Sequence, residues 1–239
     1  FFFHPQAGIP DPLWSRGLGD VYKRQDESGA PCAIVKNILD PVGCKNLINE
    51  LKDKATKGTH IRSNGSVTND EDDVRNSDIF WFNDLGLQQT LRNAVDLVNY
   101  ECGWRYDIVD SEQLQFTKYD GAKKQHYHWH TDGQGCHHNA RKSIQFHQPK
   151  EVNLNYTPQT NLLGTVRKIS LSALLNDGYE GGELMFRTLD DNSQLKEFKV
   201  EAKAGDIVVF PSFIDHKVAP VTKGIRYSVV AWYGGPPFK

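Results

Sequence analysis

The sequence predicts a mainly β protein, a β-sandwich or barrel preceded by two helices, and three observations support this fold class. From Tyr106 onward, apolar residues alternate or cluster in short segments, which is the pattern of β-strands. Glycine-containing turns separate these segments. Two stretches with helical spacing come before them. The expected strands lie near residues 113–119, 125–131, 166–175, 183–187, 196–203, 206–210, 214–219 and 225–233.

Chain length and composition suit one globular domain. The 239 residues are 38% hydrophobic and 24% charged, which is enough apolar material for one core. We expect this single domain to span residues 26–239. Its helical support covers about 40–103, and its β core covers about 106–235.

Both helices are predicted from local signals. A short β-capable run over 33–39 is followed by Asp40 and Pro41, an N-cap and a proline at the first helical position. The apolar face of this first helix is formed by Leu47, Ile48 and Leu51. The second helix runs to about Tyr100, and its apolar face is formed by Leu87, Leu91, Val95 and Val98.

The first 25 residues are set apart from the predicted domain. Gln6 to Gln25 resembles the translation of a sequencing-library adapter, whose transposon end encodes the six residues that begin at Asp20. A signal peptide beginning at Phe1 is the rival interpretation, but no basic n-region or long apolar h-region is present. We therefore interpret residues 1–25 as a non-native, adapter-derived segment.

Net charge and cysteine content indicate which partners and which cellular compartment to expect. The net charge of -2 and the pI near 6.5 predict no general attraction to nucleic acid or to membranes. The four cysteines form no C-x-x-C pair, which argues against a disulfide framework and favours a reducing cytoplasm. No apolar run approaches the roughly 20 residues of a membrane helix.

Two polar stretches interrupt the predicted elements. Residues 57–78 are rich in Asn, Asp and Ser, which indicates a surface loop. Residues 133–164 show no clear element, and such long loops are usually functional lids or disordered. Both stretches are candidates for the wall of a substrate groove.

Histidines are crowded just before and within the second of these stretches. His130 and Asp132 point to the same side of an extended strand, because residues i and i+2 share a face. His216, on a different strand, could close the third corner. Two imidazoles and one carboxylate leave three positions open on an octahedral metal, which is the non-haem Fe(II) arrangement. Zinc and manganese also accept such ligands. The neighbouring histidines, most of which we expect to be solvated, are His126, His128, His137, His138 and His147.

An alternative ligand pair is left open at this point. Under strict alternation, His126 and His128 share a face with His130, so a His128/His130 pair could also bind a metal. We rank it below the His130/Asp132 pair, because two neutral imidazoles would compensate less of the Fe(II) charge.

Arg226 lies inside an otherwise apolar strand. A guanidinium there is exposed, paired or used in binding. It is either an ordinary surface arginine or a fork that holds a carboxylate through two parallel hydrogen bonds.

Several motifs in the same order resemble the prolyl 4-hydroxylase-like branch of the 2-oxoglutarate/Fe(II) oxygenases. The resemblance covers about Leu114 to Tyr233 and includes His130-x-Asp132, the run YEGGELMF from Tyr179 to Phe186, Gly205-Asp206, His216 and Arg226. It implies a double-stranded β-helix, or jelly roll, with iron held in its mouth by His130, Asp132 and His216. It also implies that Arg226 anchors 2-oxoglutarate.

The same resemblance assigns three aromatic residues. Tyr119 would donate its hydroxyl to 2-oxoglutarate, Tyr127 would line the pocket, and Trp232 would lie near the metal. A plain core position is the alternative for Tyr127 and Trp232. The chain departs from the family in a longer segment between Asp132 and Arg167, and in having arginine at 226 where many members have lysine.

The resemblance implies a dioxygenase that uses Fe(II), 2-oxoglutarate and O2, with ascorbate as a possible reductant. Peptidyl proline is the family's default substrate, while free amino acids, other protein side chains and small metabolites stay open. Asp132 argues against a halogenase, and Trp232 and the low basicity argue against an AlkB-like nucleic-acid demethylase. Outside the enzyme class, the alternative is an inactive cupin-like binding module.

Overall fold

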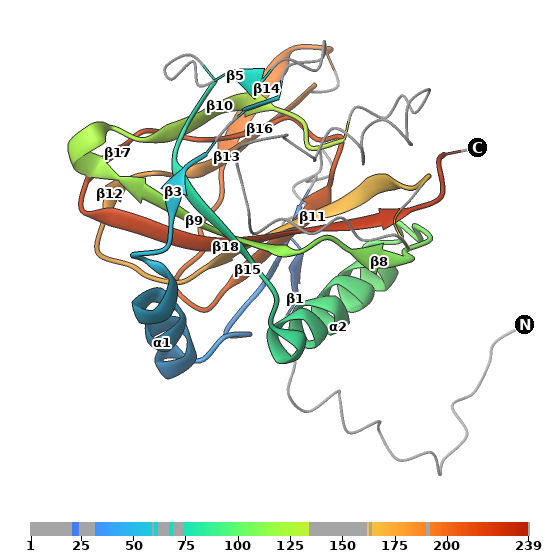
Figure 1. Cartoon of the computed structure of the whole chain (residues 1–239). Helices are drawn as coiled ribbons and strands as arrows, with labels where there is room; N and C mark the ends of the chain where they lie inside the picture. The colour runs from blue at the N-terminus through green and yellow to red at the C-terminus, as the bar shows by residue number, and fades with distance from the viewer. Residues whose placement is uncertain are drawn as a thin grey trace, which may run out of the picture.

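The protein is mainly β and has three layers, which Figure 1 shows in a computed structural model. Two helices cover one face of a large sheet, and a smaller sheet lies on its other face. The structure describes residues 21–23, 32–58, 60–61, 67–68, 74–133, 162, 164–189 and 192–238. The predicted fold class, β with N-terminal helices, is confirmed at this level.

Both helices begin after an aspartate N-cap, of which the first, Asp40, was predicted from the sequence. Helix α1 (Pro41–Leu51) starts after Asp40, whose carboxylate accepts hydrogen bonds from the amides of Val42 and Gly43 at 2.9 Å each. Helix α2 (Leu85–Glu101) starts after Asp84, which caps the amide of Leu87 at 3.0 Å. Within the described residues no helix is long and apolar enough to cross a membrane.

The large sheet is antiparallel throughout and carries half of the eight strands predicted from Tyr106 onward. Its order is β1 (Val21–Lys23), β2 (Ala33–Val35), β15 (Ile207–Pro211), β11 (Val166–Leu174), β18 (Ile225–Gly235), β9 (Leu114–Asp120), β7 (Asp78–Phe82) and β3 (Thr56–Lys57), with β8 (Asp110–Ser111) also paired to β18. The long central strands β11 and β18 therefore connect both halves of the sheet.

The small sheet is also antiparallel. Its order is β14 (Leu195–Lys199), β13 (Leu184–Leu189), β16 (His216–Val218), β10 (His126–His130) and β6 (Arg75–Asn76). Two short ladders complete the described strands, namely β12 (Glu180–Gly181) with β17 (Val221–Lys223), and β4 (His60–Ile61) with β5 (Val67–Thr68).

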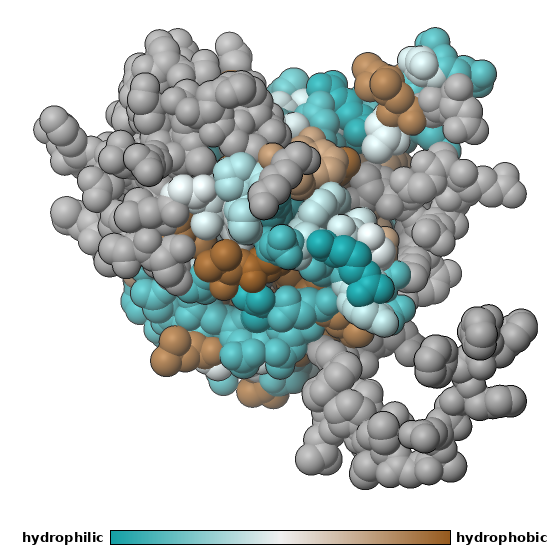
Figure 2. Space-filling view, turned by 90° about the vertical axis from the view of Figure 1, so that its right-hand side faces the viewer, coloured by the Kyte–Doolittle hydropathy of each residue, from teal (hydrophilic) through white to brown (hydrophobic). Residues whose placement is uncertain are grey.

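Alternation along β18 separates two cores. Val229, Ala231 and Tyr233 belong to the core between the large sheet and the helices. The alternate residues, including Arg226 and Trp232, point to the opposite side, toward the small sheet. There Phe186, Phe210 and Val218, among others, pack between the two sheets. On the face of the molecule in Figure 2, the described surface is mainly hydrophilic and its apolar residues form small separate groups.

The predicted surface loop over 57–78 was wrong in part. It contains β4, β5 and β6, and strand β7 begins at its end. β6 joins the small sheet because its backbone pairs with β10, with Arg75 opposite Tyr127. A strand with polar side chains shows no apolar alternation in the sequence, because backbone pairing needs only a free edge on the neighbouring strand.

The predictions for the N-terminal segment and for the 133–164 stretch are not tested by the structure. β1 falls within the segment set apart as adapter-derived, and its backbone pairs with β2 at the edge of the large sheet. The origin of that segment stays a prediction. Most of the 133–164 stretch, including residues 134–161, lies outside the described residues.

Candidate metal and carboxylate site

A β-bulge in β10 decides which histidines face the interior. Opposite β16, Tyr127 pairs with Val218 and His130 pairs with His216, so His128 and Trp129 together oppose a single residue. Tyr127 and His130 therefore share the inner face. His128 is exposed, and Trp129 lies on the outer face near Arg187 and Lys217.

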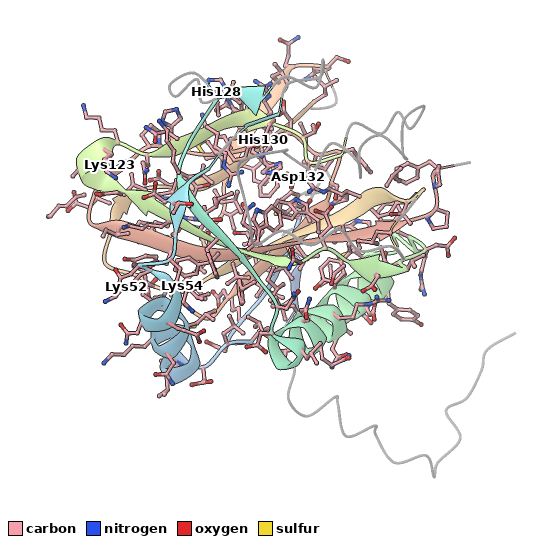
Figure 3. All side chains as sticks on the ribbon, viewed as in Figure 1. Lys52, Lys54, Lys123, His128, His130 and Asp132 are labelled. Atoms are coloured by element: carbon pink, nitrogen blue, oxygen red, sulfur yellow. The ribbon has the colours of Figure 1, made fainter. Side chains whose placement is uncertain are left out.

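The bulge overturns the expected strict alternation. His130 and Asp132 lie between the two sheets, while His128 lies further out, as Figure 3 shows. Within the described residues, the group that could hold a metal ion contains neither His126 nor His128. The His128/His130 alternative was therefore wrong, because one extra residue in the strand turns His128 outward. His137, His138 and His147 lie outside the described residues.

His130, Asp132 and His216 converge on one point. His130 Nε2 lies 3.7 Å from one Asp132 carboxylate oxygen, and His216 Nε2 lies 3.5 Å from the other. One possible ligand atom from each of the three residues lies within 4.8 Å of the others. This donor set, two imidazole nitrogens and one carboxylate, fits a divalent transition metal and leaves coordination positions open.

Backbone carbonyls orient both imidazoles. His130 Nδ1 lies 2.7 Å from the carbonyl of His128, and His216 Nδ1 lies 2.9 Å from the carbonyl of Ile214. Because a carbonyl can only accept, Nδ1 carries the proton in each ring, and Nε2 keeps its lone pair for a metal.

Electrostatics keep Asp132 and His130 in the protonation states that bind metal. Burial raises the pKa of Asp132, but His216, His130, Arg167 and a hydrogen bond from Ser170 outweigh it and lower this pKa to about 2. Burial and the neighbouring His216 lower the pKa of His130 to about 3, against the opposing effect of Asp132. At neutral pH, Asp132 is ionised and His130 is neutral.

We expect the metal-free protein to lose stability as pH falls below about 6.5. The pKa of His130 is 6.5 unfolded and about 3 folded, so between these values the unfolded chain binds a proton that the folded chain rejects. This contribution is complete above pH 6.5 and declines progressively below it. Thermal unfolding between pH 8 and pH 5, compared with His130→Gln, checks it. If the melting temperature falls equally with pH in the wild type and in His130→Gln, the prediction is contradicted.

The Tyr127 ring stacks on the His130 ring, and the Arg75 guanidinium lies over the Tyr127 ring. The ring centroids of Tyr127 and His130 lie 3.5 Å apart with the planes at 17°, and the Arg75 guanidinium lies 4.8 Å from the Tyr127 ring. Arg75 also donates to Ser77 Oγ at 2.9 Å and to Gln115 Oε1 at 2.7 Å. Arg75 was missed from sequence because it lies in the stretch interpreted as a loop.

Arg226 is enclosed between the sheets, so the surface-arginine interpretation was wrong. It is 1% exposed, and its Nη1 donates to Ser228 Oγ at 2.9 Å. Its Nε–H is buried and has no hydrogen-bond partner within the described residues. A buried cation with a free donor is costly unless an anion binds it.

The neighbours of Arg226 leave room around it. Gly182 adopts φ +68°, and a Cβ there would lie 3.0 Å from Arg226 Cδ. A cavity of about 480 Å³ reaches Arg226 between the 178–184 and 199–202 segments, and no member of the histidine–aspartate group lines it. This cavity therefore approaches the guanidinium but is not the metal site.

Tyr119 lies beside Arg226, as their pairing between β9 and β18 requires. The guanidinium carbon lies 5.4 Å from the Tyr119 ring, and the tyrosine is 3% exposed. Burial raises the pKa of Tyr119, while Arg75 and Arg226 oppose this effect. Tyr119 is thus a neutral hydroxyl next to two guanidinium groups.

Trp232 lies opposite Ser170 in the β11–β18 register, and Ser170 forms a hydrogen bond with Asp132. It is 6% exposed, packs against Trp81 at 5.6 Å between ring centroids, and is covered by Arg167 at 4.2 Å. Arg167 in turn makes a two-point contact with Glu112 at 2.5 and 2.6 Å. Trp232 is therefore both a core aromatic and a neighbour of the site. Sequence reasoning missed Arg167 and Glu112.

The fold and this site define a mainly β protein with a group that could hold one divalent metal and with an enclosed guanidinium between its two sheets. The family model described as "2OG-Fe(II) oxygenase superfamily" matches residues 114–234, half of the chain. The chain belongs to the 2-oxoglutarate/Fe(II) oxygenase superfamily.

Curated relatives match in a short segment. A PKHD-type hydroxylase of Xylella fastidiosa (strain 9a5c) is 41% identical over 66 residues, which cover 27% of this chain and 26% of that protein. A PKHD-type hydroxylase of Alteromonas mediterranea is 43% identical over 56 residues, 23% of each chain. The match thus spans about a quarter of the curated relatives' length.

Solved structures show the same fold along most of the chain. The viral collagen prolyl hydroxylase of Paramecium Bursaria Chlorella virus-1 has a TM-score of 0.55 at 18% identity, and covers 87% of this chain and 97% of its own. A Trichoplax adhaerens prolyl hydroxylase, solved with a peptide fragment of hypoxia inducible factor, has a TM-score of 0.57 at 18% identity. It covers 85% of this chain and 83% of its own.

Proposed function

We propose that this protein is an Fe(II)- and 2-oxoglutarate-dependent dioxygenase that hydroxylates a C–H bond, with peptidyl proline as its substrate. One observation carries the proposal: Tyr119 lies close enough to both the enclosed Arg226 and Asp132 of the metal-binding group for each of them to influence its hydroxyl. We also propose that these sheets form a double-stranded β-helix, or jelly roll. The fold of the similar prolyl hydroxylases supports this assignment.

We assign each residue a role from its position. His130 and His216 would bind iron through Nε2, and Asp132 through its carboxylate, which offsets part of the metal charge. Arg226 would bind the distal carboxylate of 2-oxoglutarate through its free Nε–H and its Nη2 group, with Ser228 and Tyr119 beside it. Tyr127 and Trp232 would form the walls.

The bound iron and 2-oxoglutarate would supply the oxidising chemistry, which adds one oxygen atom of O2 to the substrate and releases succinate and carbon dioxide. The chain's own residues orient the reactants and exclude water. Asp132 and His216 have side-chain exposures of 7% and 6%, so competing bulk water is largely kept away from the ligands. Ascorbate would serve to keep the iron reduced between turnovers.

Substrate class is supported by likeness of fold and by the PKHD-type relatives. Prolyl hydroxylases, one of them holding a peptide, share the fold, so we propose a peptide or protein substrate. Free amino acids and small metabolites are the alternatives. We also propose a cytoplasmic location, because four cysteines with no C-x-x-C pair argue against a disulfide framework and suit a reducing compartment.

We expect succinate release from 2-oxoglutarate with Fe(II) and ascorbate, and an increase when a proline-containing peptide is added. Mass spectrometry of a peptide panel should show the gain of one oxygen atom on proline. Oxygen gain on another residue or on a metabolite would contradict the prolyl assignment and keep the oxygenase assignment. Metal binding with no succinate release for any substrate would favour the cupin-like binding module.

A further inference from the structure

Two buried serines stand directly behind the Asp132 carboxylate. Ser170 on β11 and Ser212, just after β15, are both 0% exposed, and their hydroxyl oxygens lie 2.9 Å apart. The two positions are close because Ile169 pairs with Pro211 across neighbouring strands. Ser170 also forms a hydrogen bond with Asp132.

The direction of these hydrogen bonds follows from the chemistry of the groups. An ionised carboxylate can only accept, so the single proton of the Ser170 hydroxyl is donated to Asp132. The Ser170 oxygen must then accept the proton of Ser212. The result is a chain of two donors, from Ser212 through Ser170 to the carboxylate, in which each bond strengthens the next.

The turn that holds Ser212 also contacts the chain on both sides of the site. The amide of Gly133, the residue after Asp132, donates to the Ser212 carbonyl at 2.8 Å, and the amide of Ser212 donates to the Lys168 carbonyl at 2.9 Å. Two residues further on, the carbonyl of Ile214 orients the His216 ring. The space at Gly133 is tight, because a Cβ there would lie 3.2 Å from Ser212 Cβ.

We propose that Ser212 is a positioning residue for the metal site, acting through Ser170, and that the 211–214 turn sets the distance between the Asp132 carboxylate and His216. The inference rests on the proposed metal-binding role of these residues. Without the two hydroxyls, the carboxylate is free to rotate, and the entropy of fixing it must be paid when metal binds.

Affinity for Mn(II), measured by electron paramagnetic resonance of the free ion on the full chain without 2-oxoglutarate, tests this role. We expect Ser170→Ala to weaken binding about 10- to 100-fold, and Ser212→Ala about 10-fold, as for other groups that orient metal ligands. Ser172→Ala is the matched control, since Ser172 is a buried serine on the same strand, two residues further along. It should bind Mn(II) like the wild type.

The double variant separates a relay from two independent effects. If Ser212 acts only through Ser170, the combined variant binds Mn(II) no more weakly than Ser170→Ala alone. Additive losses, or an unchanged affinity in a folded Ser212→Ala protein, would overturn the inference. Melting curves of the metal-free variants identify any general loss of structure. The melting temperatures of Ser170→Ala and Ser212→Ala should match that of Ser172→Ala.

Failure of this inference is distinct from failure of the proposed function. Mn(II) binding to the wild type that disappears in His130→Ala establishes the metal site without any turnover. If that binding exists and Ser212→Ala leaves it unchanged, only the positioning role is wrong. If the wild type binds no Mn(II), both the metal site and the role of Ser212 are overturned.

Discussion

Replacing His130 with alanine is expected to abolish Fe(II)-dependent 2-oxoglutarate turnover and to weaken metal binding by more than about 100-fold, since even groups that only orient metal ligands cost 10- to 100-fold when removed. His130 supplies one of three ligand atoms that lie within 4.8 Å of one another. Two remaining ligands would hold the ion weakly and would not fix its open positions. Succinate release and Mn(II) affinity, measured on the same preparations, check this result.

His128→Ala is the matched control for that experiment. His128 lies on the same strand, two residues earlier, and is exposed because of the bulge. Only its backbone carbonyl contacts His130, and an alanine keeps that carbonyl. Metal affinity and succinate release should therefore stay at the wild-type level. A loss in His128→Ala equal to that in His130→Ala would contradict the outward position of His128 and favour the alternating arrangement.

Arg226→Gln is expected to raise the KM for 2-oxoglutarate strongly. Two charge-assisted hydrogen bonds to the distal carboxylate would be lost, at a cost of about 2 to 4 kcal/mol, or roughly 30- to 1000-fold. Because the metal ligands are untouched, Mn(II) affinity should not change. Steady-state kinetics over a wide range of 2-oxoglutarate concentrations measures the effect.

A 2-oxo monocarboxylic acid provides the internal control for Arg226. It offers the same metal-binding end but lacks the distal carboxylate, so it should bind weakly to the wild type and no more weakly to Arg226→Gln. Ser228→Ala should give a smaller increase in KM, since Ser228 only orients the guanidinium through one hydrogen bond of 2.9 Å. If both 2-oxo acids lose affinity equally in Arg226→Gln, the arginine does not contact the distal carboxylate.

Local signals in the sequence predicted the helices and most strands well. Asp40 begins α1, and the apolar spacing through Leu91, Val95 and Val98 buries one face of α2. These features depend on residues three or four apart, so they can be read without knowing the partner segment. The strands around His130, His216 and Arg226 followed from the same kind of pattern.

The pairing of strands that are distant in the sequence could not be predicted from local patterns. β6 joins the small sheet although its residues are polar, and this places Arg75 over Tyr127. Arg167 reaches Glu112 and Trp232 from a third strand. No spacing rule connects such residues, because their contact depends on which strands become neighbours.

The sequence by itself determined which chemical groups the site contains: two imidazoles, a carboxylate and a guanidinium on strands of a mainly β domain. Residue identity and the alternation of strands are properties of the chain. Only the tertiary structure decided that His128 faces outward, that Arg226 is enclosed, and that Ser212 reaches Asp132 through Ser170. Register, bulges and burial depend on the partner strand, so they exist only once the two sheets have packed together.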